Sequence, residues 1–465
     1  MYNAYVTRIK NLRKHPNADR LQLGECFGNT VCVSLEYADN QLGLYLPCDG
    51  QLSVEFAEVN NLLRKKDDAG NNCGGYMDPS KRNVTAIRLR GEKSDGLFLP
   101  LTCLESFGDV STLKEGDVIN TFNGHEICCK YIPRRNHRQG HVSDGNRTRK
   151  KKVDVAPLFA EHADTEQLAY NLGAFKPGDE IEITLKMHGT SQRTGYLPVF
   201  KGYKRTFKDW LLCREGKPIY DWGYVSGTRR TVLDNYDGGY YGSNEFREQH
   251  SKTFEGKLWK GETVYYEVVG FTHTGAPIMA EGNNEKLGKD FVKQYGKTTV
   301  FSYGCDPEGE SFKHEYADCW DGMNVREFKP QSDIYVYRMT MTNEDGAVVE
   351  YTPDFMRYRC EQMGVKTVPV MWKGVIPAHT GDAAAIRLGQ DAGAWIKEKA
   401  EQYYDGPDPI GKTHVREGVV VRILNRPKFT AFKHKNHNFK MISGIIVDEI
   451  ADSNVEISDE ILAEL

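Results

Sequence analysis

The chain has 465 residues, which is long for one compact core and predicts two or three domains. Its formal net charge is -4, so the whole molecule is not a polycation, and any nucleic-acid surface must be a local patch. Eleven scattered cysteines, with no apolar segment at the N-terminus, predict reduced thiols in an intracellular protein, cytoplasmic or nuclear, without a secretion signal. No window is apolar enough for a membrane span, so we expect no membrane contact.

Residues 1–129 have the pattern of a small β domain. Short apolar runs, such as Leu21–Cys26, Val31–Leu35, Gly43–Leu46 and Ala86–Leu89, are separated by Gly, Asn, Asp and Pro. Short strands with frequent turn residues and few helical stretches predict a small all-β barrel.

Two segments of this region are more specific. His15–Leu21 reads H-P-N-A-D-R-L, and Arg88–Leu97 reads R-L-R-G-E-K-S-D-G-L. Both resemble the OB-fold modules of tRNA-binding proteins, and the resemblance covers about the first 120 residues. It implies an N-terminal OB-fold barrel that binds single-stranded or structured RNA. The alternative is that Asn17 with Asp19, and Ser94–Gly96, only build turns.

Residues 130–152 form a basic segment that contains a single acid, Asp144. The composition predicts a solvated interdomain linker. Clustered Lys and Arg also favour contact with phosphates. The candidate nucleic-acid-binding residues are Arg149, Lys150, Lys151 and Lys152 in this segment, and Arg205 in the next domain.

Residues 153–443 are predicted to form a larger domain, in which apolar strands alternate with helical stretches such as Asp382–Glu401. We expect its core to include Trp210, Trp222, Trp259 and Trp320. Residues 444–465 are an acidic C-terminal tail, which we expect to be a surface helix. The whole chain is thus predicted to be an α+β protein.

Ile181–Gly195 carries the first candidate for chemistry. Ile181, Ile183 and Leu185 alternate with polar residues, which predicts a strand with one buried face that ends at Lys186. A lysine at this position has a fixed backbone and a partly desolvated amine, and desolvation favours the neutral, nucleophilic form. Gly189 leaves space for a ligand to approach the backbone.

Three later strands carry isolated charges. Glu267 lies within an apolar strand, and Glu417 with Gly418 opens a run of valines. A buried carboxylate must be paired, hydrogen-bonded or metal-bound, and a structural ion pair is the alternative for Glu267. Lys433 and Lys435 are two residues apart, which places both amines on one face of a strand. A triphosphate between them would offset their repulsion, although an exposed basic strand has the same pattern.

The order of these segments resembles the motifs of the covalent nucleotidyltransferase superfamily. The resemblance spans about residues 180–440 and extends to a Ser-Arg segment and to an aromatic strand. The matching segments are Lys186-Met187-His188-Gly189 (the nucleotidylation motif in its RNA-ligase form), Val225–Arg230, Tyr266-Glu267 with Gly270, Ile334–Arg338, Glu417–Val421, and Lys433–Asn436 with Phe439.

The resemblance implies an ATP-dependent RNA ligase whose adenylyltransferase domain (ATP-grasp-like) has antiparallel sheets flanked by helices. It implies that Lys186 attacks ATP to form a lysyl-AMP, that the AMP passes to a 5′-phosphate RNA end, and that a 3′-hydroxyl then displaces it. It also implies that Glu267 and Glu417 hold Mg²⁺ or Mn²⁺. The implied ATP- and AMP-binding residues are Lys186, Met187, His188, Gly189, Arg229, Arg230, Glu267, Tyr337, Glu417, Lys433 and Lys435.

The domain order, with the barrel at the N-terminus, resembles that of the branch of nick-sealing RNA ligases that have an N-terminal OB module. We expect a monomer that acts on RNA ends or on nicked duplexes with an RNA 3′-hydroxyl strand. A DNA ligase is the nearest alternative, and a non-catalytic RNA-binding protein is another. The sequence leaves open which of Arg229 and Arg230 contacts the nucleotide.

Overall fold

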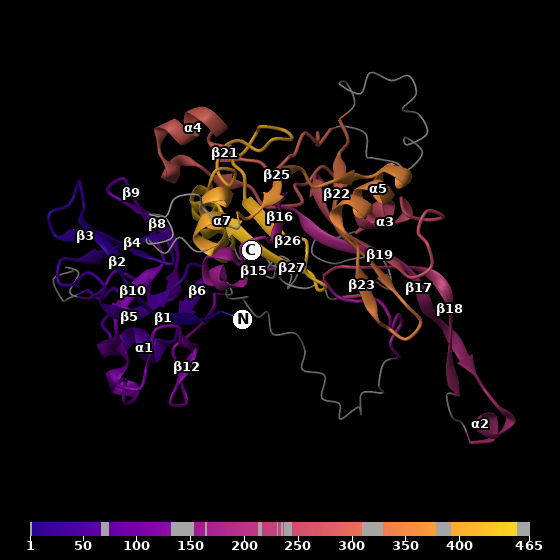
Figure 1. Ribbon diagram of the computed structural model, residues 1–465, viewed down its shortest axis with the longest axis horizontal. Coiled ribbons are helices and arrows are strands. Elements are labelled where there is room, and N and C mark those ends of the chain that lie inside the picture. Colours follow the sequence, from indigo (N-terminus) through magenta and orange to yellow (C-terminus); the bar gives the residue numbers. More distant parts are fainter. Residues whose placement is uncertain are drawn as a thin grey trace. The chain divides into compact units, whose positions relative to one another are not determined.

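The computed structural model describes residues 2–66, 74–131, 153–162, 165–212, 216–229, 231–233, 236, 244–308, 329–377 and 392–452 (Figure 1). The described residues form a mixed α+β protein in which sheets predominate. The chain divides into two compact units. The first contains Met1–Arg135 and Asn436–Val455, and the second contains Asn136–Lys435 and Glu456–Leu465.

The first unit is built from short strands, as its alternation of apolar and turn residues predicts. Its helices are α1 (Val54–Val59), the 3-10 helix η1 (Leu101–Phe107) and α8 (His437–Asp452). Its strands are β1 (Ala4–Arg8), β2 (Lys10–Lys14), β3 (Leu21–Cys26), β4 (Asn29–Ser34), β5 (Leu42–Leu46), β6 (Gly50–Leu52), β7 (Asn83–Val84), β8 (Ala86–Leu89), β9 (Glu92–Asp95), β10 (Leu97–Pro100), β11 (Val118–Ile119), β12 (Thr121–Phe122), β13 (His125–Glu126) and β14 (Cys128–Lys130).

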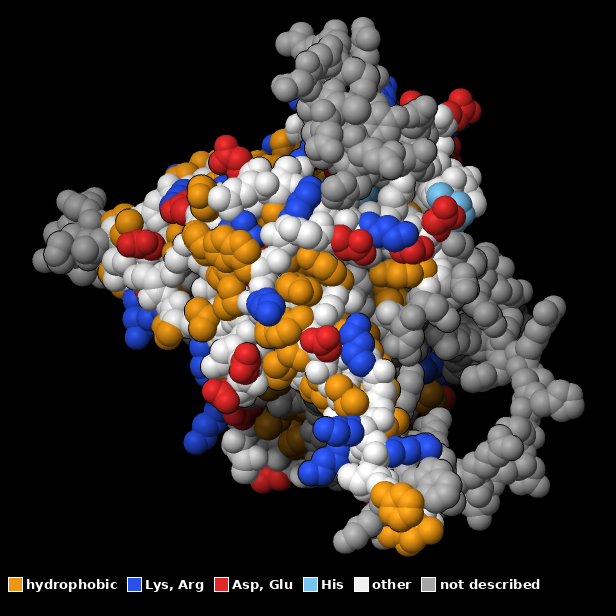
Figure 2. All heavy atoms as spheres, turned by 90° about the vertical axis from the view of Figure 1, so that its right-hand side faces the viewer, with side chains coloured by type: hydrophobic (Ala, Val, Ile, Leu, Met, Phe, Trp, Pro, Cys, Tyr) orange, Lys and Arg blue, Asp and Glu red, His pale blue; other side chains and the backbone are white. Residues whose placement is uncertain are grey.

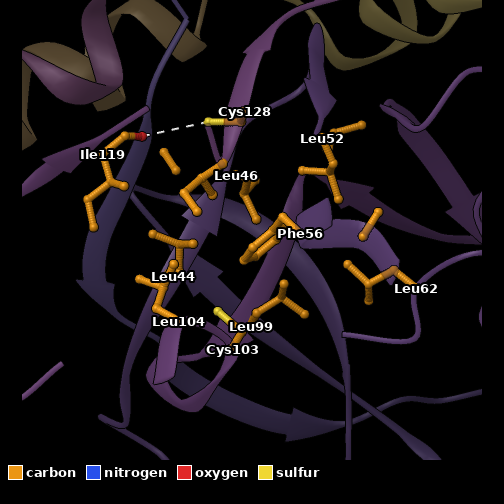
Figure 3. Close-up of a cluster of buried hydrophobic side chains, with 14 of the residues drawn as sticks. Leu44, Leu46, Leu52, Phe56, Leu62, Leu99, Cys103, Leu104, Ile119 and Cys128 are labelled. Carbon is orange, nitrogen blue, oxygen red and sulfur yellow. Dashed lines mark hydrogen bonds between the residues drawn. The ribbon is translucent and has the colours of Figure 1, made fainter. Parts of the chain in front are cut away.

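The core of this unit lies between its small sheets and α1 (Figure 3). Phe56 of α1 is fully buried among the side chains of several strands, including Leu44 and Leu46 of β5. Cys128 contributes its thiol as a hydrogen-bond donor to the Ile119 carbonyl oxygen, at 3.6 Å. The sheets have the orders β10-β5-β1-β11, β14-β6-β7, β2-β3-β4, β8-β9 and β12-β13. In the described part of this unit these pairings form no closed barrel.

The two segments that resemble tRNA-binding modules contact each other. The Asn17 side-chain amide donates to the Arg90 carbonyl oxygen at 2.9 Å, and the Arg90 guanidinium donates to the Asn17 carbonyl oxygen at 3.1 Å. The His15 ring lies 3.0 Å from the Leu89 carbonyl oxygen. These residues therefore join the turn after β2 to the β8–β9 hairpin, which is a structural role.

Asp95, in the second of these segments, anchors helix α8. Its carboxylate lies 2.6 Å from His437 Nδ1 and 3.2 Å from Lys440 Nζ. Burial alone would raise the pKa of Asp95, but the Lys440 charge and the His437 hydrogen bond outweigh it and hold this pKa below its usual range. Asn436 caps the helix, since its side-chain oxygen accepts from the backbone N–H of Asn438 at 2.7 Å. The segment that follows the Lys433/Lys435 strand is thus a helix of the first unit.

The second unit contains two larger sheets (Figure 1). The five-stranded sheet has the order β15-β27-β26-β16-β25, with β15 (Glu166–Gln167), β16 (Glu180–Lys186), β25 (Val370–Val375), β26 (Gly418–Ile423) and β27 (Thr430–Lys435). The six-stranded sheet has the order β18-β17-β19-β22-β23, with β17 (Thr190–Lys204), β18 (Lys217–Gly227), β19 (Glu262–Gly270), β22 (Ser332–Thr342) and β23 (Val348–Glu350), and β24 (Lys366–Thr367) also pairs with β22.

Helices and small elements complete this unit. They are α2 (Phe207–Leu211), α3 (Glu245–Lys252), α4 (Lys289–Tyr295), α5 (Pro353–Met363), α7 (Ala392–Glu401), the 3-10 turns η2 (Leu168–Tyr170), η3 (Leu172–Ala174) and η4 (Glu285–Leu287), and the strand pair β20 (Gly282–Asn283) and β21 (Thr298–Thr299). The predicted helix Asp382–Glu401 is confirmed over Ala392–Glu401, and its earlier part lies outside the described residues.

One face of the five-stranded sheet is apolar. Ile181 and Ile183 of β16 pack with Val419 and Val421 of β26 and with Ile396 of α7, and all five are fully buried. The predicted buried face of β16 is therefore confirmed. Because side chains alternate along a strand, the other face carries Glu182, Thr184 and Lys186.

The tryptophans depart from the expected core. Trp259 is 48% exposed and Trp222 is only half-buried, so the prediction that both lie in the core was wrong. Trp320 and the Trp210 side chain lie outside the described residues. The eight described cysteines are free thiols. Among the described helices, none is both long and apolar enough to cross a membrane.

Candidate active site

The polar face of the five-stranded sheet brings three sequence-distant segments into register. Lys186 of β16 pairs with Gly418 of β26, and Gly418 pairs with Lys435 of β27. The two lysines therefore flank a glycine in one row across three strands. Gly418 has a φ of +147°, and a Cβ there would lie 2.1 Å from the His434 carbonyl oxygen, so a side chain does not fit at this position.

Glu417, directly before β26, supplies the negative charge of this row. Its carboxylate is fully buried and lies 2.8 Å from Lys186 Nζ and 3.5 Å from Lys435 Nζ. His188 Nδ1 lies 3.5 Å from its other oxygen. Burial alone would raise the pKa of the Glu417 carboxyl, but the charges of Lys186 and Lys435 and the His188 hydrogen bond hold it well below its usual range. The Lys186 amine is thus not simply desolvated but is held by a carboxylate.

Lys433 adds a further amine to this cluster. It lies on β27 two residues before Lys435, so the predicted strand with both lysines is confirmed. Burial, followed by the positive charges of Lys435 and Lys186, lowers the pKa of Lys433 to about 7, while Glu417 opposes the shift. Lys186, Lys433 and Lys435 together carry more positive charge than the Glu417 carboxylate neutralises. This face of the sheet therefore favours an anionic ligand.

Gly189 lets β19 approach the chain directly after Lys186. A Cβ on Gly189 would lie 2.4 Å from the Val268 carbonyl oxygen and 2.9 Å from Glu267 Cγ. The space that the sequence suggested for a ligand is therefore occupied by β19. The consequence is that half-buried Glu267 lies beside the Lys186 segment.

His188 is fixed by an aromatic layer that the sequence did not indicate. Its backbone N–H donates to the Tyr303 hydroxyl at 2.6 Å, and its ring packs edge-on against Phe301 at 4.6 Å. Burial lowers the pKa of His188, although Glu417 opposes the shift. His414 packs against the same two aromatic rings, at 5.1 Å and 4.6 Å. These contacts fix the position of the turn that follows Lys186.

A pocket of about 840 Å³, a volume that includes space open to solvent, lies over the polar face of the five-stranded sheet. Strands of both large sheets and helix α5 contribute to it. Its lining residues are His162, Thr165, Glu182, Thr184, Leu185, Lys186, Met187, Ser191, Arg229, Glu267, Tyr337, Met356, Arg357, Val368, Val420, Arg422, Phe429 and Ala431.

Tyr337 presents an aromatic ring to this pocket, as the sequence predicted for the strand now seen as β22. Its hydroxyl shares a hydrogen bond of 2.9 Å with Ser191. The His162 ring packs edge-on against the Tyr337 ring at 5.0 Å and against the Phe429 ring at 6.0 Å. His162, Ser191 and Phe429 were not predicted as site residues, because no sequence motif marks them.

The predicted site residues lie in different parts of the structure. Lys186, Met187, Arg229, Glu267 and Tyr337 line the pocket, whereas Glu417 lies within ion-pair distance of both Lys186 and Lys435. Arg205 directly follows the end of β17 and is not among the residues that line the pocket. Arg230 and the predicted nucleic-acid-binding residues Arg149, Lys150, Lys151 and Lys152 lie outside the described residues.

The carboxylates of Glu267 and Glu417 differ in how readily they could bind a divalent cation. Glu267 lines the pocket and is half-buried, so its oxygens suit a cation that arrives with phosphates. Glu417 already faces Lys186, Lys435 and His188, and a cation bound directly to it would have to separate the 2.8 Å pair. No group of three or more potential ligands occurs within the described ranges.

No protein-family model matches the chain, and no curated protein sequence matches it. Solved structures of an RNA ligase from Naegleria gruberi do resemble it. A variant of that ligase with AMP and Mn has a TM-score of 0.51 at 15% identity, and the alignment covers 94% of this chain and 97% of that chain. An apo variant has a TM-score of 0.51 at 16% sequence identity, and the ligase with pyrophosphate has a TM-score of 0.50 at 15% identity. Both alignments cover 94% of this chain and 97% of that chain. The chain therefore has a fold similar to that of an RNA ligase over nearly its whole length.

Proposed function

We propose that the protein is an ATP-dependent RNA ligase that joins a 3′-hydroxyl RNA end to a 5′-phosphate end, with nicks as its substrate. The observation that carries the proposal is the Lys186 amine, which lies at the end of a buried strand, opens on the pocket and is surrounded by Lys435, Lys433 and Glu417. Such an arrangement suits transfer of a nucleotidyl group, because this chemistry depends on positioning and charge neutralisation.

In the proposed first step, Lys186 Nζ loses its extra proton to solvent and attacks the α-phosphorus of ATP as the neutral amine, and a second N–H proton leaves as the P–N bond forms. A P–N bond forms, the bond to the bridging oxygen breaks, and pyrophosphate leaves with the negative charge. Lys433 and Lys435 stabilise the phosphate oxygens, and Arg229 is the arginine that we assign to the nucleotide, since it lines the pocket. The AMP then passes from Lys186 to the 5′-phosphate, and the 3′-hydroxyl displaces AMP to seal the strand.

The remaining contacts of the nucleotide follow from the pocket. We assign the adenine to the ring of Tyr337, which the Ser191 hydrogen bond orients. A bound Mg²⁺ or Mn²⁺ would neutralise phosphate charge, and Glu267 is the carboxylate best placed to hold it. Direct metal binding by Glu417 stays a prediction. The AMP, Mn and pyrophosphate that accompany the structural neighbours support this assignment.

We further propose that the N-terminal unit acts as an OB-fold RNA-binding module, within residues 1–129, and that residues 130–152 are a basic linker that contacts phosphates through Arg149–Lys152. The ligase domain, which the sequence placed at residues 153–443 before an acidic tail 444–465, would end at Lys435, because α8 belongs to the first unit. The resemblance of the two N-terminal segments to tRNA-binding modules supports this division.

The test uses the native protein with ATP labelled at the α-phosphate, followed by nicked duplexes that differ only in the sugar of the 3′-hydroxyl strand. We expect covalent label on the protein and faster sealing with the RNA strand. Equal rates on an all-DNA nick would instead indicate a DNA ligase. No label at all would favour the non-catalytic RNA-binding alternative.

The depressed pKa of Lys433 predicts that nucleotide binding takes up a proton. A lysine of pKa about 7 is about nine-tenths neutral at pH 8, and phosphates beside it restore the charged form. Calorimetry at pH 8 with a non-cleavable ATP analogue, in buffers of different ionisation enthalpy, should show uptake of close to one proton. The dissociation constant should rise up to about tenfold per pH unit above pH 7.

The matched control for this linkage is Lys433→Met, which retains the aliphatic stem but cannot titrate. It should bind the analogue more weakly with proton uptake near zero. Uptake that persists in this variant would assign the linkage to another group.

A further inference from the structure

The β17–β18 hairpin extends well beyond the sheet from which it starts. β17 pairs with β19 only from Thr190 to Gly195, whereas its pairing with β18 continues to Lys204. The outer part, residues 196–204 and 217–224, is therefore a two-stranded arm that projects from the second unit and ends near α2 (Figure 1).

One face of the arm is covered by the chain itself. Leu197 and Val199 pack with Val225, Ala156 and Phe159 in a small buried cluster. Because side chains alternate along each strand, the residues between them lie on the opposite face.

The opposite face carries five aromatic rings and one proline, arranged as three cross-strand pairs. Tyr196 pairs with Tyr224, Pro198 pairs with Trp222, and Phe200 pairs with Tyr220. The rings of Tyr196 and Tyr224 are stacked at 4.7 Å, and Tyr196 lies 5.8 Å from Trp222. All six side chains are only half-buried.

The rings are held in place by their edges. The Tyr224 hydroxyl accepts a hydrogen bond from the Gly256 backbone N–H at 2.6 Å, and the Tyr220 hydroxyl donates to the Asp154 carbonyl oxygen at 3.1 Å. Aromatic side chains that are already ordered lose little conformational entropy when a planar ligand stacks on them.

The charge of the arm suits a polyanion. Within residues 196–205 and 217–224 the charged side chains are Lys201, Lys204, Arg205, Lys217 and Asp221, which is four cations against one acid in a chain of net charge -4. Lys260 also lies 5.2 Å from the Trp222 ring on the aromatic face. Figure 2, which views this side of the molecule, shows hydrophobic surface interspersed with Lys and Arg.

Aromatic rings on a sheet face, with cations beside them, are how sheet-based RNA-binding domains stack two or three unpaired bases. We propose that the aromatic face of the β17–β18 arm binds an unpaired stretch of RNA beside the end to be joined. This inference rests on the proposed function for the identity of the substrate. It adds that RNA with a single-stranded flank binds better than a fully paired nick.

The test compares native protein with the double variant Tyr196→Leu/Trp222→Leu, which keeps apolar bulk but removes two ring faces. Binding of a labelled single-stranded RNA 12-mer and of a 12-base-pair RNA duplex is measured by fluorescence anisotropy. We expect single-strand affinity to fall at least about tenfold per ring and duplex affinity to change less than about twofold. The matched control is Tyr358→Leu, an exposed tyrosine of α5, which should change neither affinity.

Two further readouts separate this inference from the proposed function. Photo-crosslinking of 5-iodouridine RNA to native protein should map to the arm, and this does not require ligation. Labelling of the double variant with ATP involves no RNA and shows that it is folded. If native protein is labelled but single-strand affinity does not change in the variant, the arm is not an RNA site and the ligase proposal stands.

If the native protein is not labelled while crosslinks and the affinity loss both map to the arm, the RNA site stands and the ligase proposal fails. A change of sedimentation coefficient in the double variant without an effect on RNA would identify the face as a contact between copies of the chain, and would overturn the inference.

Discussion

Replacing Lys186 with methionine should abolish covalent labelling of the protein by ATP labelled at the α-phosphate. Methionine keeps the length and the apolar character of the side chain but has no amine, so no P–N bond can form. The Lys186 side chain is 23% exposed at the pocket, and the substitution should therefore cost little packing. Label is measured by gel after denaturation, with the acid lability that a phosphoramidate shows.

The matched control is Lys373→Met, which removes an exposed lysine from β25, the other neighbour of β16 in the same sheet. It should be labelled like the native protein. Peptide mapping of the native adduct should place AMP on Lys186. An adduct on Lys433 or Lys435, or normal labelling of the Lys186→Met variant, would contradict the assignment of the nucleophile.

The strands that carry the site could be predicted from sequence because each has one fully buried face. Ile181, Ile183 and Leu185 show the two-residue period of β16 directly, and the valines after Glu417 show β26. Their pairing could not be predicted from periodicity, because Lys186 and Gly418 are more than 200 residues apart. Lys186, Gly418 and Lys435 form a row only because of the register in which the three strands pair, and this register depends on the whole sheet.

The same limit explains why the space at Gly189 was wrongly assigned to a ligand and why some pocket residues were not predicted. Local sequence shows that a side chain is absent but not what fills the space, which here is β19. His162 and Phe429 line the pocket from segments without a motif. Asp95 lies in a segment that the sequence predicted to be either part of an RNA-binding module or a turn. Its partners His437 and Lys440 lie more than 340 residues away, in a segment that the sequence placed in the larger domain.

Glu417→Gln should both destabilise the second unit and remove self-adenylylation. The native carboxylate is fully buried between Lys186, Lys435 and His188, so the neutral amide leaves buried cations without their counter-charge. We expect a loss of about 3–5 kcal/mol in the free energy of unfolding. Labelling by ATP should fall at least about 100-fold, because Lys186 loses the partner that positions its amine.

Stability is measured by urea unfolding followed by tryptophan fluorescence, since all six tryptophans belong to the second unit. The low pKa of Glu417 in the folded protein means that its stabilisation is present above about pH 4.3 and is lost as the pH falls toward the folded value. The difference between native protein and variant should therefore shrink below about pH 4.

The matched control for Glu417→Gln is Glu262→Gln. Glu262 is also fully buried, but its partners are Arg359, at 2.8 Å, and Tyr351 rather than Lys186. This variant should lose stability to a similar degree and should still be labelled, once rates are referred to folded protein. If both variants were labelled equally well, Glu417 would be a structural ion-pair partner only. If Glu417→Gln alone lost labelling, the buried carboxylate would be required to hold the nucleophile, which is the role that its contacts with Lys186 and Lys435 predict.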